Sequence, residues 1–322
     1  MKDPRQQKLV GPVISLPTFS DESHNLLLDR QRKHIRWLIS HGVSEGNGVL
    51  LVAGGYGEGY FLEDNELYAL IDVLIEETAG KIPTMIGIFD LSARAAARKS
   101  RYAADAGIDF IELGMPHYSS PSEEDVYLYI QYINDHADVA IMPYNNFWVM
   151  PNGFELTRGL FERFIELEHV VGFKWGSATE DHYTGMLKLF SDQFNFIDNG
   201  MVGSQGARWG MKGFVDFYGN VAPRLAMKKW DLFKNRKYDE LDELLSKQID
   251  AEKKLNTPDS PTFGSVADGV FGHVRWKLMG LEAGPSFPAQ AEPDSDFIEH
   301  TRKVIEANGI LEWVDFDQAM FD

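Results

Sequence analysis

The sequence predicts an α/β fold, a (β/α)8 barrel of the TIM type with a C-terminal helical appendage. Three observations lead to this prediction. Eight short apolar runs can be counted, they alternate with stretches of helical period as far as about residue 235, and the chain has 322 residues. That length suits one large barrel with an extension.

The apolar runs are the predicted strands, each with the length of a buried parallel strand. In order they are Val13 to Leu16, Val49 to Ala53, Thr84 to Ile88, Phe110 to Leu113, Val139 to Met142, Val170 to Phe173, Phe194 to Ile197 and Gly213 to Phe217. An open doubly wound sheet is the competing fold, and it often carries a glycine-rich fingerprint after its first strand. Here Pro17-Thr18-Phe19 follows, which favours the closed barrel.

Amphipathic segments between the runs are predicted helices. In the first of them, apolar residues recur with a spacing near 3.6, which places them on one face: Leu28, Ile35, Leu38 and Ile39. Another segment begins Ser122-Glu123-Glu124-Asp125, the pattern of a capping box ahead of an apolar stripe.

The strand pattern stops after about Arg224. Three helices are predicted beyond it, separated by proline-rich stretches: Asp239 to Leu255, Val266 to Leu278 and Asp294 to Ala307. We therefore divide the chain into a catalytic barrel, residues 9–223, and a C-terminal helical region, residues 224–322. The tail carries Trp313, Phe316 and Phe321 among acids, and these aromatics are expected to pack against a surface that the sequence does not identify.

The composition excludes several classes of function. The absence of cysteine excludes disulfide frameworks, thiolate metal sites and cysteine nucleophiles. A formal net charge of −18 repels the phosphate backbone, so nucleic acid is not an expected partner. The polar N-terminus lacks a signal peptide's apolar segment, and no apolar run approaches the roughly 20 residues of a membrane helix. A soluble cytoplasmic protein with no membrane partner is expected.

Lys174 is the candidate nucleophile. It follows the apolar run Val170 to Phe173, at the end of a predicted strand where barrel enzymes hold their catalytic groups. Burial disfavours the ammonium form and makes a neutral amine available to attack carbonyls. On position alone, a lysine that reaches solvent or pairs with a carboxylate is the simpler interpretation. Tyr144 ends the neighbouring strand, and a phenol beside the amine can shuttle protons, which favours catalysis.

The loop from Gly54 to Gly59 is the candidate carboxylate site. Its glycines leave backbone N–H groups accessible, and a nest of amides around Gly55 and Tyr56 can hold carboxylate oxygens. A dinucleotide loop is the alternative. However, the glycines at positions 55, 57 and 59 lack the G-x-G-x-x-G spacing, and the loop follows the second strand.

No metal and no cofactor are expected. The histidines are scattered, without H-x-x-x-H or histidine–carboxylate ligand spacing. Ser204 lies in Gly203-Ser204-Gln205-Gly206, which does not meet the G-x-S-x-G pattern of a nucleophile elbow. A turn is therefore the expected structure there.

Together these residues resemble the dihydrodipicolinate synthase and N-acetylneuraminate lyase superfamily of Schiff-base class I aldolases. The resemblance runs from about Gly11 to Gly309. It is carried by the order and spacing of three motifs: Gly-x-x-Gly-Glu at 54–58, the Tyr144-Asn145 pair and Val171-Gly172-Phe173-Lys174.

The resemblance implies roles for individual residues. Lys174 corresponds to the Schiff-base lysine and Tyr144 to the proton-shuttling tyrosine. Tyr118 corresponds to a tyrosine that reaches into a neighbouring subunit's site, which implies a homo-oligomer, either a dimer or a tetramer. The substrate-binding positions assigned with them are Gly54, Gly55, Tyr56, Asn146 and Val215.

Departures from the family pattern bear on the substrate. Gly55 and Tyr56 stand where many members have Thr-Thr, and the glycine loop looks closer to the 5-dehydro-4-deoxyglucarate dehydratase branch. Val149 stands where dihydrodipicolinate synthase carries the arginine for its second substrate, which argues against that activity. Phe147 and Trp148 suit an aromatic or less polar substrate tail, or else pack under a loop.

We therefore expect a cofactor-free lyase, an aldolase or a dehydratase, that acts through an imine on Lys174. Its substrate would be a 2-oxo acid such as a deoxy-keto sugar acid or a pyruvate adduct. The alternative is a non-catalytic barrel of the same family that binds a 2-oxo acid as a sensor or structural subunit. The missing Thr-Thr pair and the bulk after Tyr144 favour this alternative. A metal-dependent barrel has less support.

Overall fold

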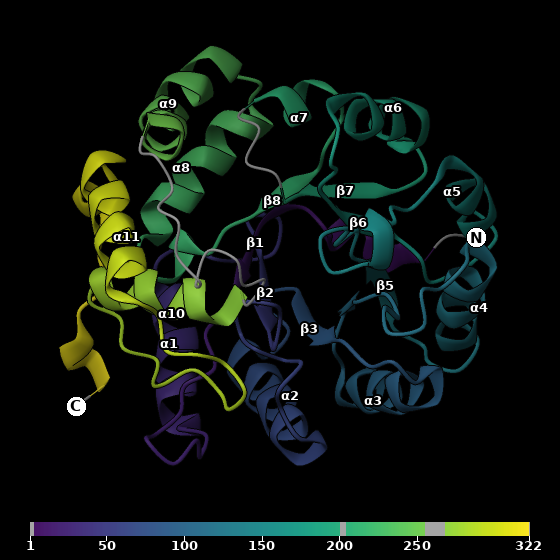
Figure 1. Ribbon diagram of the computed structural model, residues 1–322, viewed down its shortest axis with the longest axis horizontal. Coiled ribbons are helices and arrows are strands. Elements are labelled where there is room, and N and C mark those ends of the chain that lie inside the picture. The colour runs from purple at the N-terminus through teal and green to yellow at the C-terminus, as the bar shows by residue number, and fades with distance from the viewer. Residues whose placement is uncertain (1–2, 200–203, 255–267, 322) are drawn as a thin grey trace.

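Eight parallel strands form a barrel in the computed structural model, which describes residues 3–199, 204–254 and 268–321 (Figure 1). The strands are β1 (Gly11–Ser15), β2 (Val49–Val52), β3 (Thr84–Ile88), β4 (Phe110–Leu113), β5 (Ala140–Pro143), β6 (Gly172–Trp175), β7 (Asn195–Asp198) and β8 (Gly213–Val215). Their order is β5-β4-β3-β2-β1-β8-β7-β6, and the bridges Ile141–Val170 and Tyr144–Lys174 join the two ends. The predicted (β/α)8 barrel is confirmed.

Helices alternate with the strands and surround them: α1 (Leu28–Ser40), α2 (Asp64–Thr78), α3 (Ala93–Ala106), α4 (Glu123–Asn134), α5 (Arg158–Phe164), α6 (Glu180–Phe190), α7 (Gln205–Arg208) and α8 (Pro223–Lys234). The expected apolar face of α1 packs on the main core, with Ile35 and Leu38 fully buried. The capping box before α4 is confirmed, because Ser122 and Asp125 each accept the other's backbone N–H. Short 3-10 helices complete the chain: η1 (Pro4–Lys8), η2 (Pro151–Gly153), η3 (Tyr218–Asn220), η4 (Ile310–Trp313) and η5 (Gln318–Phe321).

Strand alternation divides the core into two parts. Phe173 and Trp175 of β6 point outward into the cluster beneath the helices. A second cluster, which includes Phe110 and Met142, fills the barrel interior. Side chains two positions further along the same strands point inward as well, because the side-chain period of a strand is two. Polar side chains thereby reach the layer above the apolar interior.

Six of the eight predicted strands differ from the observed ones by one or two residues at one or both ends, and two of these differences affect the site. The eighth stops at Val215 rather than Phe217, because the Asp216 carboxylate accepts the Gly219 N–H at 2.9 Å and turns the chain into η3. The sixth begins at Gly172 and includes Lys174, which pairs with Ile197 of β7. Lys174 is therefore held by the sheet itself.

The C-terminal helices α9 (Tyr238–Lys254), α10 (Asp268–Leu278) and α11 (Ser295–Ala307) lie together beside α8 (Figure 1). The expected helix ends at Leu255 and Val266 and the proline-rich residues 257–261 lie outside the described residues. α8 contacts β1 and takes the place of the eighth barrel helix. The division at residue 223 stays a prediction.

The aromatic tail packs back onto the first helix of the barrel. Phe316 meets Trp37 of α1 edge-to-face at 5.4 Å between ring centroids, and Phe321 meets Phe19 at 5.1 Å. These rings belong to a separate hydrophobic core that lies between the barrel and the appendage, distinct from the barrel interior. Within the described ranges, every helix is too short or too polar to cross a bilayer.

Candidate active site

Three inward side chains meet at the carboxyl end of the barrel: Glu112 from β4, Tyr144 after β5 and Lys174 from β6. Lys174 and Glu112 are 2% and 0% exposed. The Lys174 Nζ donates to Glu112 Oε1 at 3.2 Å and lies 3.2 Å from Oε2 as well. The Tyr144 N–H donates to the Leu113 carbonyl and the Asn145 N–H to the Lys174 carbonyl. These bonds place the carboxyl ends of β4, β5 and β6 side by side, at the same height along the barrel.

Tyr144 presents its ring face to the amine. The Lys174 Nζ lies 3.9 Å from the ring centroid, a cation–π contact. The Tyr144 hydroxyl accepts a hydrogen bond from Asn199 Nδ2 at 3.1 Å. Burial raises the pKa of Tyr144 well above its ordinary value, and the charges of Asp268 and Glu112 raise it further. The expected adjacency of Tyr144 and Lys174 is confirmed, while the proton-shuttle role stays a prediction.

The glycine loop after β2 lies against Asp268, the first residue of α10. The Asp268 carboxylate occupies the space that a side chain at Gly55 would need, so a larger residue there would have to displace it. Burial raises the pKa of Asp268; the nearby Lys174 charge opposes this effect, and Glu112 adds to it. A carboxyl group from the appendage therefore sits at the position expected to receive the substrate's carboxylate.

Glu58 fastens this loop to the appendage. Its carboxylate is fully buried and contacts His273 Nε2 at 2.8 Å, while the Phe287 N–H and the Gln290 side chain donate to its other oxygen. Glu58 itself has a positive φ of 55°, an uncommon conformation for a residue with a side chain. The Gly-Glu motif thus holds the loop in place from outside the pocket.

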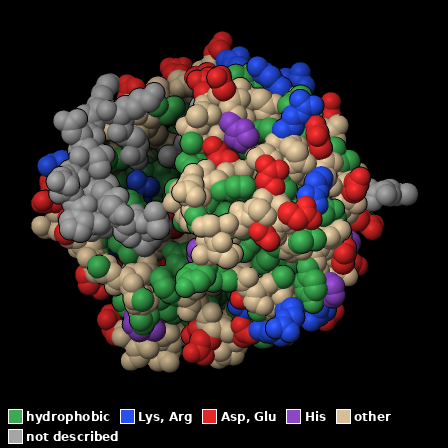
Figure 2. Space-filling model, turned by 45° about the vertical axis from the view of Figure 1, so that its right-hand side comes forward, with side chains coloured by type: hydrophobic (Ala, Val, Ile, Leu, Met, Phe, Trp, Pro, Cys, Tyr) green, Lys and Arg blue, Asp and Glu red, His purple; other side chains and the backbone are tan. Residues whose placement is uncertain are grey.

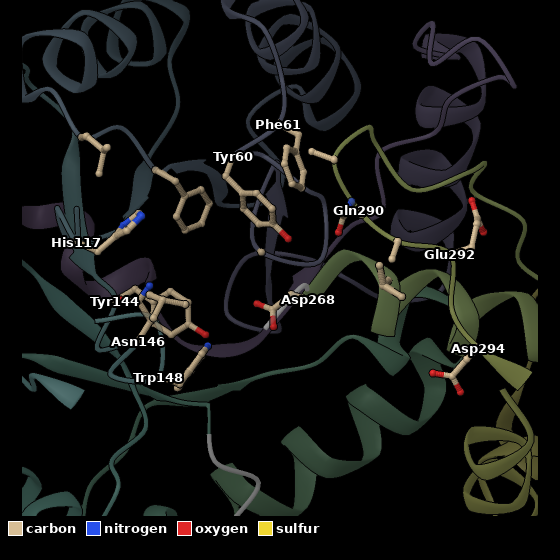
Figure 3. Close-up of a pocket in the computed structure, with 17 residues that line it drawn as sticks. Tyr60, Phe61, His117, Tyr144, Asn146, Trp148, Asp268, Gln290, Glu292 and Asp294 are labelled. Atoms are coloured by element: carbon tan, nitrogen blue, oxygen red, sulfur yellow. The ribbon is translucent and has the colours of Figure 1, made fainter. Parts of the chain in front are cut away.

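A pocket of about 940 Å³ is lined by Gly55, Tyr144 and Asp268, whereas Lys174 and Glu112 are not among its lining residues (Figure 3). Its apolar and aromatic side includes Tyr60, Phe61, Phe89, Leu91, Trp148, Val149 and Val270, and its acids are Asp268, Glu292 and Asp294. Figure 3 shows Asp268 between Tyr60 and Tyr144, with Gln290 and Glu292 on the opposite side from His117. None of the described lining residues is Lys or Arg. In the space-filling view, green hydrophobic side chains gather beside a hollow (Figure 2).

The structure separates the predicted binding residues into two groups. Gly55 and Asn146 line the pocket, and the Asn146 Oδ1 is buried without a hydrogen-bond partner among the described residues. Tyr56 packs on Phe217, 5.2 Å between ring centroids, in the core between barrel and appendage.

The remaining predicted positions lie away from the pocket wall. Gly54 packs tightly against Leu51 and Ser15, and Val215 lies half-buried above the barrel interior. Tyr118 is 87% exposed, which leaves its side chain available to a second subunit. Its role across an interface stays a prediction.

Sequence reasoning missed Glu112, Asp268 and Asn199. The sequence does point to Glu112, because it is an acid inside the apolar run Phe110 to Leu113. It lies two residues after Phe110, so its side chain points to the same inner face of the strand. The sequence does not point to Asp268, since its approach to Gly55 depends on how α10 packs. Asn199 follows β7 directly, and the strand-end rule applies to it as it does to Tyr144.

One group of metal-binding residue types lies at the opposite end of the barrel. Asp3, Asp138 and His169 have ligand atoms within 4.8 Å of one another, although they are far apart in sequence. The Arg5 guanidinium lies among them and donates to both carboxylates. This arrangement is an ion-pair cluster with its cation already present. Ser204, as expected, lies in a turn, and its hydroxyl donates to Asp242 at 2.8 Å.

Comparison with known proteins agrees with the fold. The dihydrodipicolinate synthetase family profile matches residues 21–261. The chain is 26% identical over 306 residues to 4-hydroxy-tetrahydrodipicolinate synthase of Methanopyrus kandleri, covering 94% of this chain and 96% of that enzyme. The enzyme of the same name from Bradyrhizobium diazoefficiens is 27% identical over 194 residues, covering 59% of this chain and 64% of its own.

Two solved structures share the fold at low sequence identity. PhdJ bound to a substrate intermediate has a TM-score of 0.81 and 17% identity, covering 97% of this chain and 99% of its own. Chloride-inhibited dihydrodipicolinate synthase from Acinetobacter baumannii, in complex with pyruvate, has a TM-score of 0.77 and 18% identity, covering 94% and 99%. At these identities the likeness is one of fold.

Proposed function

Because this chain belongs to the dihydrodipicolinate synthetase family, we propose that it is a lyase that forms a Schiff base between Lys174 and a 2-oxo acid. The observation that carries the proposal is the Lys174 amine, 2% exposed at the barrel mouth, beside a carboxylate and the face of Tyr144. A buried amine among proton-transfer groups suits nucleophilic attack on a carbonyl.

In the proposed reaction the protonated imine acts as an electron sink. The C3–C4 bond of the substrate can then break, or a hydroxyl can leave as water, and both reactions share the same intermediate. The substrate carboxylate would be held by backbone amides at Gly55, in the pocket that Asn146 also lines. Asp268 must then be protonated or move, because two carboxylates in one buried site repel each other.

We propose further that the substrate's tail is uncharged and partly apolar, so that the activity differs from dihydrodipicolinate synthesis. Support comes from the pocket lining, in which the described residues include acids and aromatics without Lys or Arg. Trp148 and Val149 are among these residues, and Phe147 packs on Trp148 at 5.1 Å between centroids. An anionic tail would enter such a pocket without a counter-charge, which is costly.

Borohydride trapping tests the Schiff base. The protein is mixed with pyruvate and reduced, and the masses of the intact chain and its peptides are measured. An adduct is expected on the peptide that holds Lys174 and is expected to disappear in Lys174→Ala. Lys229→Ala is the matched control, because Lys229 is a second buried lysine paired with a carboxylate, Asp216, at 3.1 Å.

The absence of any adduct, with pyruvate and with larger 2-oxo acids, would remove the proposal. The alternative of a non-catalytic barrel would then gain support, and it is favoured by the Asp268 carboxyl against Gly55. Turnover that is lost in Lys174→Ala would exclude that alternative.

Two substrates matched in size test the tail. One 4-hydroxy-2-oxo acid carries a phenyl group at C4, and the other carries a carboxyethyl group. We expect kcat/KM to be higher for the phenyl compound by about tenfold or more, because burying an unpaired charge costs at least about 1.4 kcal/mol. Val149→Arg should narrow this difference by supplying a cation in the pocket. An equal or reversed preference in the unmodified protein would contradict the uncharged tail.

A further inference from the structure

Glu112 is a buried acid whose carboxylate has few hydrogen-bond donors around it. It is 0% exposed, and Lys174 is the one hydrogen-bond partner of its carboxylate among the described residues. Its Oε2 makes no hydrogen bond in that part of the chain, although it lies 3.2 Å from the Lys174 Nζ. A buried carboxylate normally has several donors, because its desolvation is costly. This one faces a single group, the amine.

We propose that Glu112 is the catalytic base and acid of imine formation: it takes a proton from the Lys174 ammonium and later delivers it to the departing hydroxyl. The inference rests on the proposed function, since it assigns a step of the same reaction. Glu112 touches the reacting nitrogen, so its role would be direct.

A second buried pair in the molecule shows what a structural carboxylate looks like here. The Lys229 Nζ donates to Asp216 Oδ2 at 3.1 Å, and the other oxygen of Asp216 accepts the Gly219 N–H at 2.9 Å. Asp216 thus anchors a turn of backbone as well as the lysine. Glu112 anchors no backbone among the described residues, so its contact with Lys174 is its distinguishing feature.

The other groups around the amine are less suited to accept its proton. Tyr144 presents its ring face to the Nζ, and its hydroxyl accepts from Asn199. Asp268 approaches from α10, lies against Gly55, and has a pKa raised by burial, which favours its neutral form. Among the described residues, the titratable groups that face Lys174 are Glu112 from β4, Tyr144 just after β5 and Asp268 from α10.

The steps balance in protons. Glu112 removes one proton from the ammonium, and the neutral amine attacks the C2 carbonyl. A second proton passes from the nitrogen to the former carbonyl oxygen, which gives a neutral carbinolamine. Protonated Glu112 then donates to that hydroxyl, water leaves, and the nitrogen lone pair forms the iminium with one proton remaining. Glu112 ends as a carboxylate beside the iminium cation, so its charge stabilises the intermediate.

The test is the rate of imine formation, measured by mixing with pyruvate and quenching with borohydride at successive times. Glu112→Gln keeps the size and a hydrogen-bonding oxygen but cannot take a proton. We expect its trapping rate to fall roughly 10²- to 10⁴-fold, the usual range for a general acid–base group. Formate should raise the rate of Glu112→Ala with its concentration. Asp216→Asn, the matched buried control, should trap within about twofold of the unmodified protein, by analogy with sites remote from chemistry.

The pH profile separates proton transfer from mere positioning. The unmodified protein should trap at a nearly constant rate from pH 6 to pH 9, whereas Glu112→Gln should speed up with pH as solvent takes the proton instead. A steep rise in the unmodified protein would overturn the inference even if the variants did not fold. A Glu112→Gln rate within threefold of the unmodified protein would also overturn it, while leaving the Schiff base on Lys174 intact.

Discussion

The two ends of the barrel each hold a buried carboxylate beside a cation, and the two sites are built differently. At the amino end, Asp3 is 3% exposed and accepts hydrogen bonds from the Arg5 N–H, the Arg5 guanidinium and His169 Nδ1. At the carboxyl end, Glu112 is 0% exposed, and its carboxylate accepts a hydrogen bond only from Lys174 among the described residues. Both groups have been removed from water, but only one has been compensated by several donors.

The difference teaches how to separate a structural acid from a reactive one in this molecule. Burial by itself would raise the pKa of Asp3, but hydrogen bonds from His169 and Arg5 outweigh it and hold that pKa far below its usual range. Asp3 is therefore held as an anion near neutral pH, and its ion pairs with Arg5 and His169 join η1 to the amino ends of the barrel strands. At the mouth, burial raises the pKa of Asp268, and Glu112 and Lys174 share a contact with few other partners. This is the site at which we propose proton transfer.

Asp3→Ala should give the largest change in stability. We expect the free energy of unfolding to fall by about 3 kcal/mol, because Arg5 and His169 lose a buried partner. Chemical denaturation measures this, and the rate of imine trapping should stay unchanged. Asp138→Ala is the matched control, since that partner of Arg5 is 84% exposed and should cost at most about 1 kcal/mol.

Asp3→Ala should also change how the free energy of unfolding depends on pH in acid. The folded pKa of Asp3 lies below its unfolded value of about 3.9, so its stabilising contribution is present above that pH and is lost as the pH falls further. The unmodified protein should lose stability between about pH 4 and pH 2 more steeply than Asp3→Ala. If the free energy of unfolding fell equally steeply with pH in both proteins, Asp3 would not be an anion stabilised by Arg5 and His169.

Asp268→Asn should have a smaller effect of the opposite sign. The folded pKa of Asp268 is raised, so the group contributes most stability below its unfolded pKa and loses it as the pH rises through the folded pKa. At pH 7 the amide should therefore raise the free energy of unfolding by about 1 kcal/mol, the scale of other site-relieving substitutions. The gain should vanish near pH 3.

Glu292→Gln is the control for this experiment, because Glu292 is an exposed acid of the same pocket and should shift stability by less than about 0.5 kcal/mol. A loss of stability in Asp268→Asn at pH 7 would break the comparison between the two ends. It would mean that Asp268, like Asp3, is an anion that its surroundings stabilise.

Much of the fold followed from local pattern. The apolar runs predicted each strand, because a parallel strand buried on both faces needs apolar residues throughout. The meeting of Lys174 and Tyr144 followed as well, since neighbouring parallel strands bring their carboxyl ends together. The inward direction of Glu112 also follows from the two-residue repeat of a strand, but the rule that selects residues at strand ends does not select an acid within a strand.

The amino-acid sequence alone determined the barrel, the capping of α4 and the lysine at the mouth, because these depend on backbone periodicity and on residues close in the chain. Only the tertiary structure decided that Asp268 lies on Gly55, that Arg5 joins Asp3 to Asp138, and that Phe316 packs on Trp37. Each of these contacts joins segments separated by more than a hundred residues. Such contacts are selected by the packing of whole elements, which no local periodicity records.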